Sequence, residues 1–377
     1  MLRAIALALI GKENALAARQ NWQEWITNGH DTAKVDLWIG YQQRSLFDDV
    51  PLQLVIKRDQ YSATITTKSR IKTRDIDESR IQPGFSAAFG PFRRFTGGDK
   101  DYERLMRSNP RLAAHLSVFG EDIALSKALT WLKELNYKLL EKRKEGQLLE
   151  PLRQFINQAG FLPHEIRLTD ISSEGVIFTD ADNNRVPVEN LSDGYRSILS
   201  MTFEIIRQLS LSYPKDDLFS LDATTITLPG IVLIDEIDAH LHPEWQRRIG
   251  FWLTEHFPNI QFIVTTHSPL VCQAASKGSI WRLPAPGSDQ PSYRISSDSE
   301  EWKRLVYGDI LEAYSTDLFG ENIDRSKEAQ EKYERLGELS VKELDAPLSK
   351  SEQTELEQLM DELPSTSYQQ TVGIIHD

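Results

Sequence analysis

The sequence predicts an α/β protein with a mixed sheet, an antiparallel β lobe, a helical insertion and a helical C-terminal tail. The continuous apolar runs Ile231–Ile234 and Ile260–Val264 are typical of strands buried on both faces of a parallel sheet. Between them, the apolar residues of Trp245–His256 recur at helical spacing. A strand, a helix and a second strand within about 35 residues predict a βαβ unit.

Composition excludes several classes of protein. The chain has 377 residues, of which 40% are hydrophobic and 26% are charged. These values are close to the average of soluble globular proteins and unlike those of disordered, collagen-like or integral membrane chains. The formal net charge of −13 argues against a uniformly basic nucleic-acid binder. The single cysteine, Cys272, cannot form an intramolecular disulfide, which favours a cytoplasmic protein.

The first twenty residues allow two interpretations. Arg3 followed by the apolar run Ala4–Ile10 resembles a short secretory signal. The alternative is a helix inside the folded protein that ends at Gly11, and the motifs described below favour it. No run of 18 or more apolar residues occurs in the chain, so we expect no membrane span.

The next part of the chain predicts the β lobe. Three short β-rich segments lie at Lys34–Ile39, Leu52–Lys57 and Tyr61–Thr67, and the turn residues between them indicate an antiparallel meander. We expect a loop over Lys68–Arg80 and a segment broken by Gly and Pro at Ala87–Phe95.

Helical patterns follow from 101 to 161, and they resume as a long helix from Gly194 to Leu211 and again after Glu300. Between the first two helical regions, short β-rich runs predict three strands, at Ile166–Leu168, Gly175–Thr179 and Arg185–Val188.

Charge is distributed unevenly along the chain. Between Lys57 and Arg111 there are 13 basic and 7 acidic residues, an excess that suits contacts with a nucleic-acid backbone or forms a solvated basic surface. From Glu321 to Glu362 there are 13 acidic and 6 basic residues, which favours a solvated helical appendage.

Two carboxylates directly follow the first buried strand. Asp235 and Glu236 should therefore lie at the carboxyl edge of the sheet, where α/β folds bind ligands. Asp235 can hold Mg²⁺, usually through water, and Glu236 can orient or deprotonate a water that attacks a phosphate. The alternative is a strand that ends in a polar turn.

The second buried strand ends in Thr265-Thr266-His267-Ser268. Because both strands belong to one βαβ unit, we expect His267 at the same edge as the acid pair, where it can hydrogen-bond a γ-phosphate. A single histidine after a strand is more often structural, and the neighbouring acids favour the functional interpretation.

A third motif, Leu191-Ser192-Asp193-Gly194-Tyr195, opens the long helix. Ser192 or Asp193 is a natural N-cap. Gly194 lets the backbone approach an anion at the positively polarised helix N-terminus. The motif predicts a phosphate cradle, and its alternative is an ordinary capped helix.

In this order, LSDGY, IVLIDE and TTHS resemble the second half of an ABC-type ATPase head, which is a P-loop NTPase fold. More closely, the chain is similar to prokaryotic AAA-type ATPase core proteins related to SMC, RecF and the OLD nucleases. The resemblance covers Asn190–Leu270 and implies that the three motifs are the signature motif, Walker B and the switch histidine. It also implies ATP and Mg²⁺ as cofactors.

The resemblance assigns Asp238, His240, Leu241 and His242 to the D-loop, and the sequence HLHP is similar to the RecF/OLD-like branch. A rival interpretation makes His240 and His242, together with Asp235, ligands of a zinc-like metal in a nuclease or phosphatase.

The P-loop GxxxxGK[ST], which holds nucleotide phosphates, does not occur in the sequence. The segment Leu2–Leu9 resembles the helix that directly follows the P-loop. We therefore expect Met1 to lie just past that loop, the alternative being a chain that has lost it. The sequence leaves the position of the Q-loop glutamine open, with Gln82 as the candidate. Arg93 and Arg94 are interpreted either as phosphate or DNA contacts or as a solvated loop.

The resemblance predicts four segments, namely a remnant of the first ATPase lobe (1–100), a helical insertion (101–161), the second ATPase lobe (162–298) and an acidic helical extension (299–377). It implies an ATP-hydrolysing switch that works as a homodimer, in which Ser192 and Gly194 contact the nucleotide of the opposite protomer. The insertion is too short for the coiled coil of an SMC protein. That favours a compact effector in DNA repair or anti-phage defence, with a nuclease and DNA as partners. The alternative function is a catalytically inactive module for dimerisation or partner binding.

Overall fold

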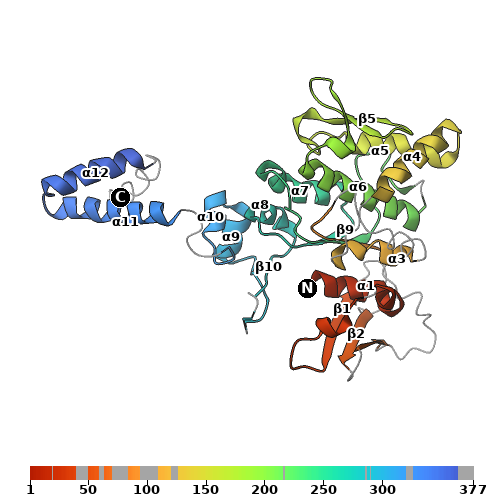
Figure 1. The fold of residues 1–377 in the computed structure, drawn as a ribbon, viewed down its shortest axis with the longest axis horizontal. Coiled ribbons are helices and arrows are strands. Elements are labelled where there is room, and N and C mark those ends of the chain that lie inside the picture. Colours follow the sequence, from red (N-terminus) through yellow and green to blue (C-terminus); the bar gives the residue numbers. More distant parts are fainter. Residues whose placement is uncertain are drawn as a thin grey trace. The chain divides into compact units, whose positions relative to one another are not determined.

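The computed structural model describes residues 1–18, 20–39, 50–58, 63–69, 84–93, 109–119, 126–214, 217–284, 287–288, 290–319 and 326–363. The chain divides into two compact units, Met1–Gly278 and Ser279–Asp377. Figure 1 shows the helices and strands of both units. The segment boundaries expected at residues 100, 161 and 298 stay predictions.

A parallel sheet of three strands forms the centre of the first unit, in the order β4 (Phe85–Phe89), β8 (Gly230–Ile234) and β9 (Ile260–Val264). Helix α7 (Pro243–His256) connects β8 to β9, so the expected βαβ unit is confirmed. Strand β9 is only half-buried, whereas we expected a fully buried strand. β9 lies at one edge of the described sheet, but edge position alone does not account for its exposure, since β4 lies at the other edge and is fully buried.

Strand β4 was not expected, because Ala87–Phe95 was interpreted as a broken segment. All five residues of β4 are buried, and they pair in register with β8, Phe85 opposite Gly230 and Phe89 opposite Ile234. The break at Gly90-Pro91 comes only after the strand. The sequence FSAAF is too short and too poor in β-branched residues to be read as a strand without its neighbour.

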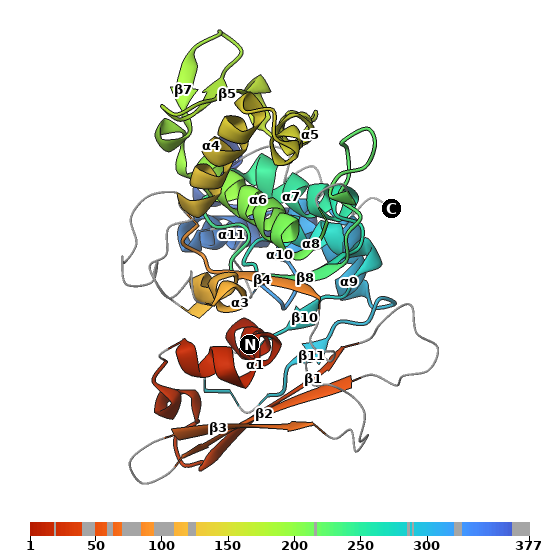
Figure 2. The same cartoon turned by 90° about the vertical axis from the view of Figure 1, so that its right-hand side faces the viewer.

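The sheet lies between two layers of helix, as Figure 2 shows. Since side chains alternate along a strand, Ala88 and Leu233 pack with helix α1 (Leu2–Ala17) on one face. Phe89 and Val232 pack with α7 and with helix α6 (Asp193–Ser212) on the other face. This is a three-layer α/β arrangement.

Helix α1 belongs to the folded unit, as the helical interpretation predicts. Ala6, Leu7, Leu9 and Ile10 are buried. The helical backbone is interrupted at Gly11, as the sequence predicts, where φ is 77° and ψ is 169°, and a second helical stretch then continues to Ala17. Among the residues that the structure describes, no helix is both long and apolar enough to cross a membrane.

The β lobe is the antiparallel meander that the sequence predicts, in the order β1 (Thr32–Ile39), β2 (Val50–Arg58) and β3 (Ala63–Ser69). The expected loop over Lys68–Arg80 begins later than predicted, because β3 continues to Ser69. Its remaining residues lie outside the described ranges.

The remaining elements of the first unit are short helices and a small antiparallel sheet, β5-β6-β7. They are α3 (Pro110–Ala113), α4 (Ser126–Leu140), α5 (Leu149–Ile156), β5 (Arg167–Ile171), β6 (Val176–Thr179), β7 (Arg185–Pro187) and α8 (Pro269–Cys272), with 3₁₀ turns at Trp22–Trp25, Leu116–Phe119, Lys144–Leu148, Pro163–Glu165, Val188–Asn190 and Gln273–Lys277.

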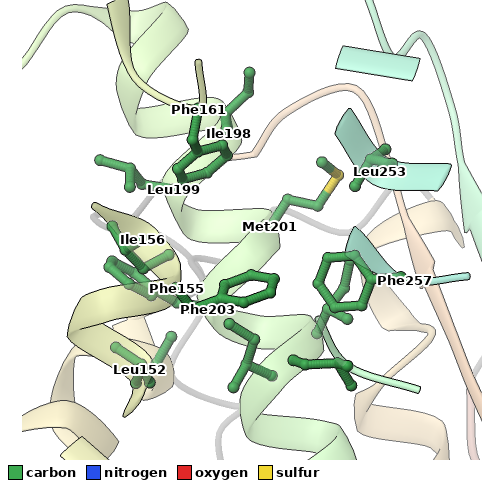
Figure 3. Close-up of a cluster of buried hydrophobic side chains, with 14 of the residues drawn as sticks. Leu152, Phe155, Ile156, Phe161, Ile198, Leu199, Met201, Phe203, Leu253 and Phe257 are labelled. Atoms are coloured by element: carbon green, nitrogen blue, oxygen red, sulfur yellow. The ribbon is translucent and has the colours of Figure 1, made fainter. Parts of the chain in front are cut away.

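An aromatic cluster joins α5, α6 and α7 (Figure 3). The fully buried ring of Phe155 lies 5.4 to 5.5 Å from the rings of Phe219, Trp252 and Phe257. The pairs with Trp252 and Phe257 are edge-to-face, a geometry that adds to the stabilisation from burial. The cluster packs α6 and α7 together on the face of the sheet opposite to α1.

The described residues of the second unit form a short hairpin and four helices. They are β10 (Trp281–Arg282), β11 (Tyr293–Arg294), α9 (Glu300–Tyr307), α10 (Ile310–Tyr314), α11 (Lys327–Asp345) and α12 (Lys350–Glu362). Helices α11 and α12 lie side by side around a small core of Leu336, Leu339, Leu356 and Leu359. The expected acidic helical tail is therefore a helical hairpin here, and β10 and β11 were not expected.

The buried ring of Phe155 yields a first prediction. Phe155→Ala removes a ring with many aromatic neighbours and should lower the free energy of unfolding by about 3–5 kcal/mol. Chemical denaturation followed by tryptophan fluorescence measures it, since Trp252 contacts the ring. Tyr137→Ala on α4, where the side chain is 65% exposed, should change stability by less than about 0.5 kcal/mol. Equal effects of the two variants would contradict this packing.

A buried histidine yields a pH prediction. Burial lowers the pKa of His115 to about 4, while its bond to the Arg111 carbonyl raises the pKa and the Arg111 charge lowers it. The unfolded chain therefore binds a proton below pH ~6.5 that the folded chain does not bind until pH ~4. As the pH falls from ~6.5 to ~4, the free energy of unfolding should decrease by about 1.4 kcal/mol per pH unit. His115→Leu should remove this part of the pH dependence. The exposed His30→Gln serves as the control. Urea denaturation at several pH values measures the stability of the parent and of both variants. If the stability of His115→Leu depends on pH as that of the parent does, the assignment is refuted.

Candidate active site

The motifs at the ends of β8 and β9 meet at one edge of the sheet. In the parallel register Ile234 lies opposite Val264, so the segment that starts at Asp235 follows β8 exactly where Thr265 follows β9. The two segments are joined by hydrogen bonds from Thr265 N to Ile234 O and from Ile237 N to Thr265 O, both 3.0 Å long. The predicted placement of the two motifs at a common edge is thus what the structure shows.

Thr265 is the side chain that organises the acid pair. Its Oγ1 donates to Asp235 Oδ1 at 2.6 Å and accepts from the Glu236 backbone N–H at 2.8 Å. Thr266 makes a similar contact one residue on, donating to Asp238 Oδ1 at 2.5 Å. The two threonines of TTHS therefore hold three acidic residues of the neighbouring loop, a role that we did not assign to them from the sequence.

The predicted catalytic side chains are accessible. Glu236 and His267 are exposed, and Asp235 is half-buried. Glu236 has φ 47° and His240 has φ 66°, so both lie in the left-handed region that residues other than glycine rarely adopt. Backbone strain of this kind persists only where surrounding contacts enforce it. The Glu236 side chain is thus presented by a constrained loop.

The donor set at this edge suits Mg²⁺. Oδ1 of Asp235 accepts a hydrogen bond from the Thr265 hydroxyl, which orients the carboxylate and uses one of its two oxygens. Mg²⁺ in phosphate sites is typically held by one or two carboxylates together with water and phosphate oxygens. A single oriented aspartate beside an exposed glutamate meets that requirement, so Asp235 is the residue that would hold the ion.

Arg93 lies beneath this loop, and both interpretations of it from the sequence are wrong. It is 4% exposed, so it neither lies in a solvated loop nor extends to phosphate or DNA. The guanidinium instead donates five hydrogen bonds, to Ser197 Oγ (3.0 Å), Gly90 O (3.0 Å), Asp235 O (2.8 Å), Glu236 O (3.0 Å) and Ile237 O (3.4 Å). Arg94 and Gln82 lie outside the described residues, as does most of the basic stretch from 57 to 111.

The charge of Arg93 is balanced by the acids above it. Burial lowers the pKa of Arg93 to about 10, while the carboxylates of Asp238, Glu236 and Asp235 raise it. The side chain therefore stays protonated at neutral pH. A buried cation beneath three carboxylates offsets part of their mutual repulsion.

The signature segment begins α6, with exposed side chains at its tip. Ser192 is the N-cap residue, but its side chain makes no capping hydrogen bond. Asp193 forms an ion pair with Arg196, and both Ser192 and Asp193 are exposed. The first N–H groups of a helix have no partner within the helix, so this N-terminus can receive an anion.

The other two residues of the signature segment contribute to packing. Leu191 is buried in the core. Tyr195 is half-buried, donates from its hydroxyl to Pro163 O at 3.1 Å, and packs its ring against Trp245 at 5.3 Å. The sequence predicts nucleotide contact for the whole segment, and the structure shows that these two residues hold it in place.

The signature and D-loop segments touch each other at Gly194. A Cβ at this position would lie 2.9 Å from His240 O, closer than real Cβ atoms approach. Glycine is therefore required by the contact with the D-loop as well as by any close approach to an anion. In the same segment Leu241 is buried and Asp238 is half-buried, whereas His240 and His242 are exposed.

The rival metal interpretation finds no support in the arrangement of the histidines. His242 is the N-cap of α7, and its Nδ1 accepts from Glu244 N at 3.4 Å. Within the described ranges, no three His, Cys, Asp or Glu side chains come together as metal ligands. His242 thus has a local structural role.

Comparison with known proteins gives three kinds of match. A family model described as "AAA domain, putative AbiEii toxin, Type IV TA system" matches residues 77–273. The chain is 47% identical to "Retron Ec83 probable ATPase" of Escherichia coli over 107 residues, 28% of this chain and 19% of that protein. It is 31% identical to "Retron Vc95 probable ATPase" of Vibrio cholerae serotype O1 biovar El Tor over 235 residues, 59% of this chain and 43% of that protein.

A third relative is the "Septu protein PtuA" of Bacillus mycoides, 28% identical over 283 residues, 74% of this chain and 34% of that protein. The matched region spans less than half the length of each of these relatives. Among solved structures, an SMC head bound to the C-winged helix domain of ScpA is similar with a TM-score of 0.47 and 15% identity, covering 79% of this chain and 86% of that chain. The SMC head domain from Thermotoga maritima has a TM-score of 0.34 and 13% identity, covering 72% and 76%.

The Thr265 contacts yield a third prediction. Thr265→Val keeps the shape of the side chain but leaves Asp235 Oδ1 and the Glu236 N–H without their partner. The free energy of unfolding should fall by about 1–3 kcal/mol. Thr254→Val on the exposed side of α7 is the matched control and should change stability by less than about 0.5 kcal/mol. Chemical denaturation of both variants decides, and a Thr265→Val protein as stable as the control would contradict the assigned contacts.

Proposed function

This chain belongs to the family of AAA domains described above, as its resemblance to prokaryotic AAA-type ATPases predicts, and we propose that it forms the catalytic and signature side of an ATP-hydrolysing switch. The observation that carries the proposal is the meeting of three motifs in one unit. The acid pair and TTHS share a sheet edge through the register of β8 and β9. The signature segment touches the same loop at Gly194.

The proposed roles follow from exposure and orientation. Asp235 holds Mg²⁺ through its carboxylate, directly or through water. Glu236, exposed on a constrained backbone, orients or deprotonates the water that attacks the γ-phosphate. His267 follows β9 at the same edge and is exposed, so it hydrogen-bonds the γ-phosphate and reports whether it is present.

The signature segment acts on a second nucleotide in this proposal. Ser192 and Asp193 are exposed at the N-terminus of α6, while Leu191 and Tyr195 secure the segment from within. An exposed helix N-terminus on a rigid support is suited to the phosphates of an ATP bound by a partner protomer. Two copies that pair head to tail would each complete the site of the other, so the active form is a homodimer.

The proposed biological setting is anti-phage defence, with DNA repair as the alternative. The retron and Septu names of the relatives support this setting. By analogy of family alone, a nuclease is the partner that the switch controls, and DNA is the substrate of that partner.

Glu236→Gln yields the fourth prediction. It removes the proposed base and preserves shape, so ATP turnover should fall by at least about a hundredfold while ATP binding remains. The chain contains no GxxxxGK[ST]. The measurement therefore uses a fusion protein in which a P-loop segment is placed before Met1. Phosphate release gives the rate, and equilibrium binding of a labelled ATP analogue gives the affinity.

Glu244→Gln is the matched control, because Glu244 is an exposed acid of the same region that pairs with Arg248. It should turn over ATP at the parental rate. Turnover per chain should also rise with protein concentration if the homodimer is the active form. Undiminished ATP turnover in Glu236→Gln would contradict the proposed mechanism. No turnover in the parent protein, with the P-loop segment present, would favour the inactive binding module.

A further inference from the structure

We propose that Arg93 is a positioning residue of the candidate active site, which fixes the backbone of Asp235–Ile237 and couples it to α6 through Ser197. Movement of the signature helix would then change how Glu236 is presented. The inference rests on the proposed function for the reaction that it serves. The coupling itself is a property of the described contacts and can be measured without ATP.

The first step is that every donor of Arg93 is used. A guanidinium carries five N–H groups in a planar fork, and the structure gives Nε one acceptor, Nη1 two and Nη2 two. A buried arginine without such partners would be costly. The bonds to the loop go to three consecutive main-chain carbonyls and not to the carboxylates. The residue therefore fixes the path of the backbone and leaves the acidic side chains available.

The second step is that the fixed backbone includes a strained residue. Glu236 lies at φ 47°, an unfavourable conformation for a residue other than glycine that persists only under constraint. Its N–H is held by Thr265 Oγ1, and its carbonyl is held by Arg93 Nη2 at 3.0 Å and by the Ala239 N–H at 2.9 Å. Arg93 thus helps to enforce the conformation that exposes the Glu236 side chain.

The third step is the connection to the signature helix. Ser197 is one turn beyond Asp193 in α6, is 1% exposed, and accepts from Arg93 Nε at 3.0 Å. Nε and both Nη atoms belong to one rigid plane. If Ser197 moves and Nε moves with it, the whole guanidinium plane tilts. The hydrogen bonds from Nη1 and Nη2 to the loop then tilt as well. Contact of the α6 N-terminus with a phosphate would be transmitted to Glu236 by this route.

The test, our fifth prediction, is amide hydrogen exchange of the intact chain in the segment 235–240. Arg93→Ala should accelerate exchange there by about tenfold or more, and Arg93→Lys by an intermediate factor, because one ammonium cannot reach all five acceptors. Ser197→Ala should accelerate exchange in 235–240 by about threefold or more, although among the described contacts no hydrogen bond joins Ser197 to that segment directly. Added guanidinium, far below denaturing concentrations, should restore slow exchange in Arg93→Ala.

Two controls separate coupling from general destabilisation. Ser200→Ala removes a fully buried hydroxyl from the same helix, and Arg185→Ala removes an exposed arginine paired with Asp170. Both should leave exchange in 235–240 unchanged. If Arg93→Ala accelerates exchange uniformly through the first unit without rescue by guanidinium, its role is only structural. Unchanged exchange in Ser197→Ala would overturn the coupling.

Failure of this inference can be told apart from failure of the proposed function. The exchange experiment needs no nucleotide, whereas the Glu236→Gln experiment measures turnover. An active ATPase with a loop insensitive to Ser197→Ala would refute the coupling alone. A coupled loop in a protein that does not hydrolyse ATP would refute the function alone.

Discussion

One buried guanidinium joins the parts of the chain that carry its motifs. Arg93 enters from the end of β4, bonds to the loop after β8 and bonds to α6. Arg93 is 104 residues from Ser197 and 142 residues from Asp235 in the sequence. The contact is possible because the parallel register aligns the ends of β4 and β8 and because the apolar face of α6 packs on the same sheet. The sheet and helix provide the frame, and Arg93 with Thr265 sets the geometry of the acids within it.

The constraint has an energetic logic. A buried charge and two left-handed backbone conformations are unfavourable taken singly. Here they compensate, because the charge is fully hydrogen-bonded and sits beneath three carboxylates that raise its pKa against the effect of burial. Proteins tolerate such local cost where a geometry has to be held against relaxation, which is typical of functional sites. The exposed Glu236 and His267 are consistent with that view.

Much of this fold could be predicted because its signals are local. The apolar runs of β8 and β9, the period of α7 and the β-rich segments of the meander each indicate an element by themselves. The meeting of Asp235 with the TTHS motif followed from a topological rule. Strand β4 could not be predicted, because FSAAF is weakly β-forming and becomes a strand through pairing with β8. The same holds for Arg93, since burial of an arginine depends on carbonyls from distant segments. The sequence signal that could have suggested it is an arginine placed right after the Gly90-Pro91 break at a strand end.

The central claim is that the Arg93 guanidinium is locked beneath the acid loop in solution. The most direct measurement is a nitrogen-resolved NMR spectrum of the arginine side chains, with Arg93→Lys used to assign the signal. We predict that the Arg93 Nε–H exchanges with water at least about a hundredfold more slowly than that of the exposed Arg185, as expected of a fully bonded, buried donor. An Arg93 signal that exchanges as fast as that of Arg185 would contradict the account.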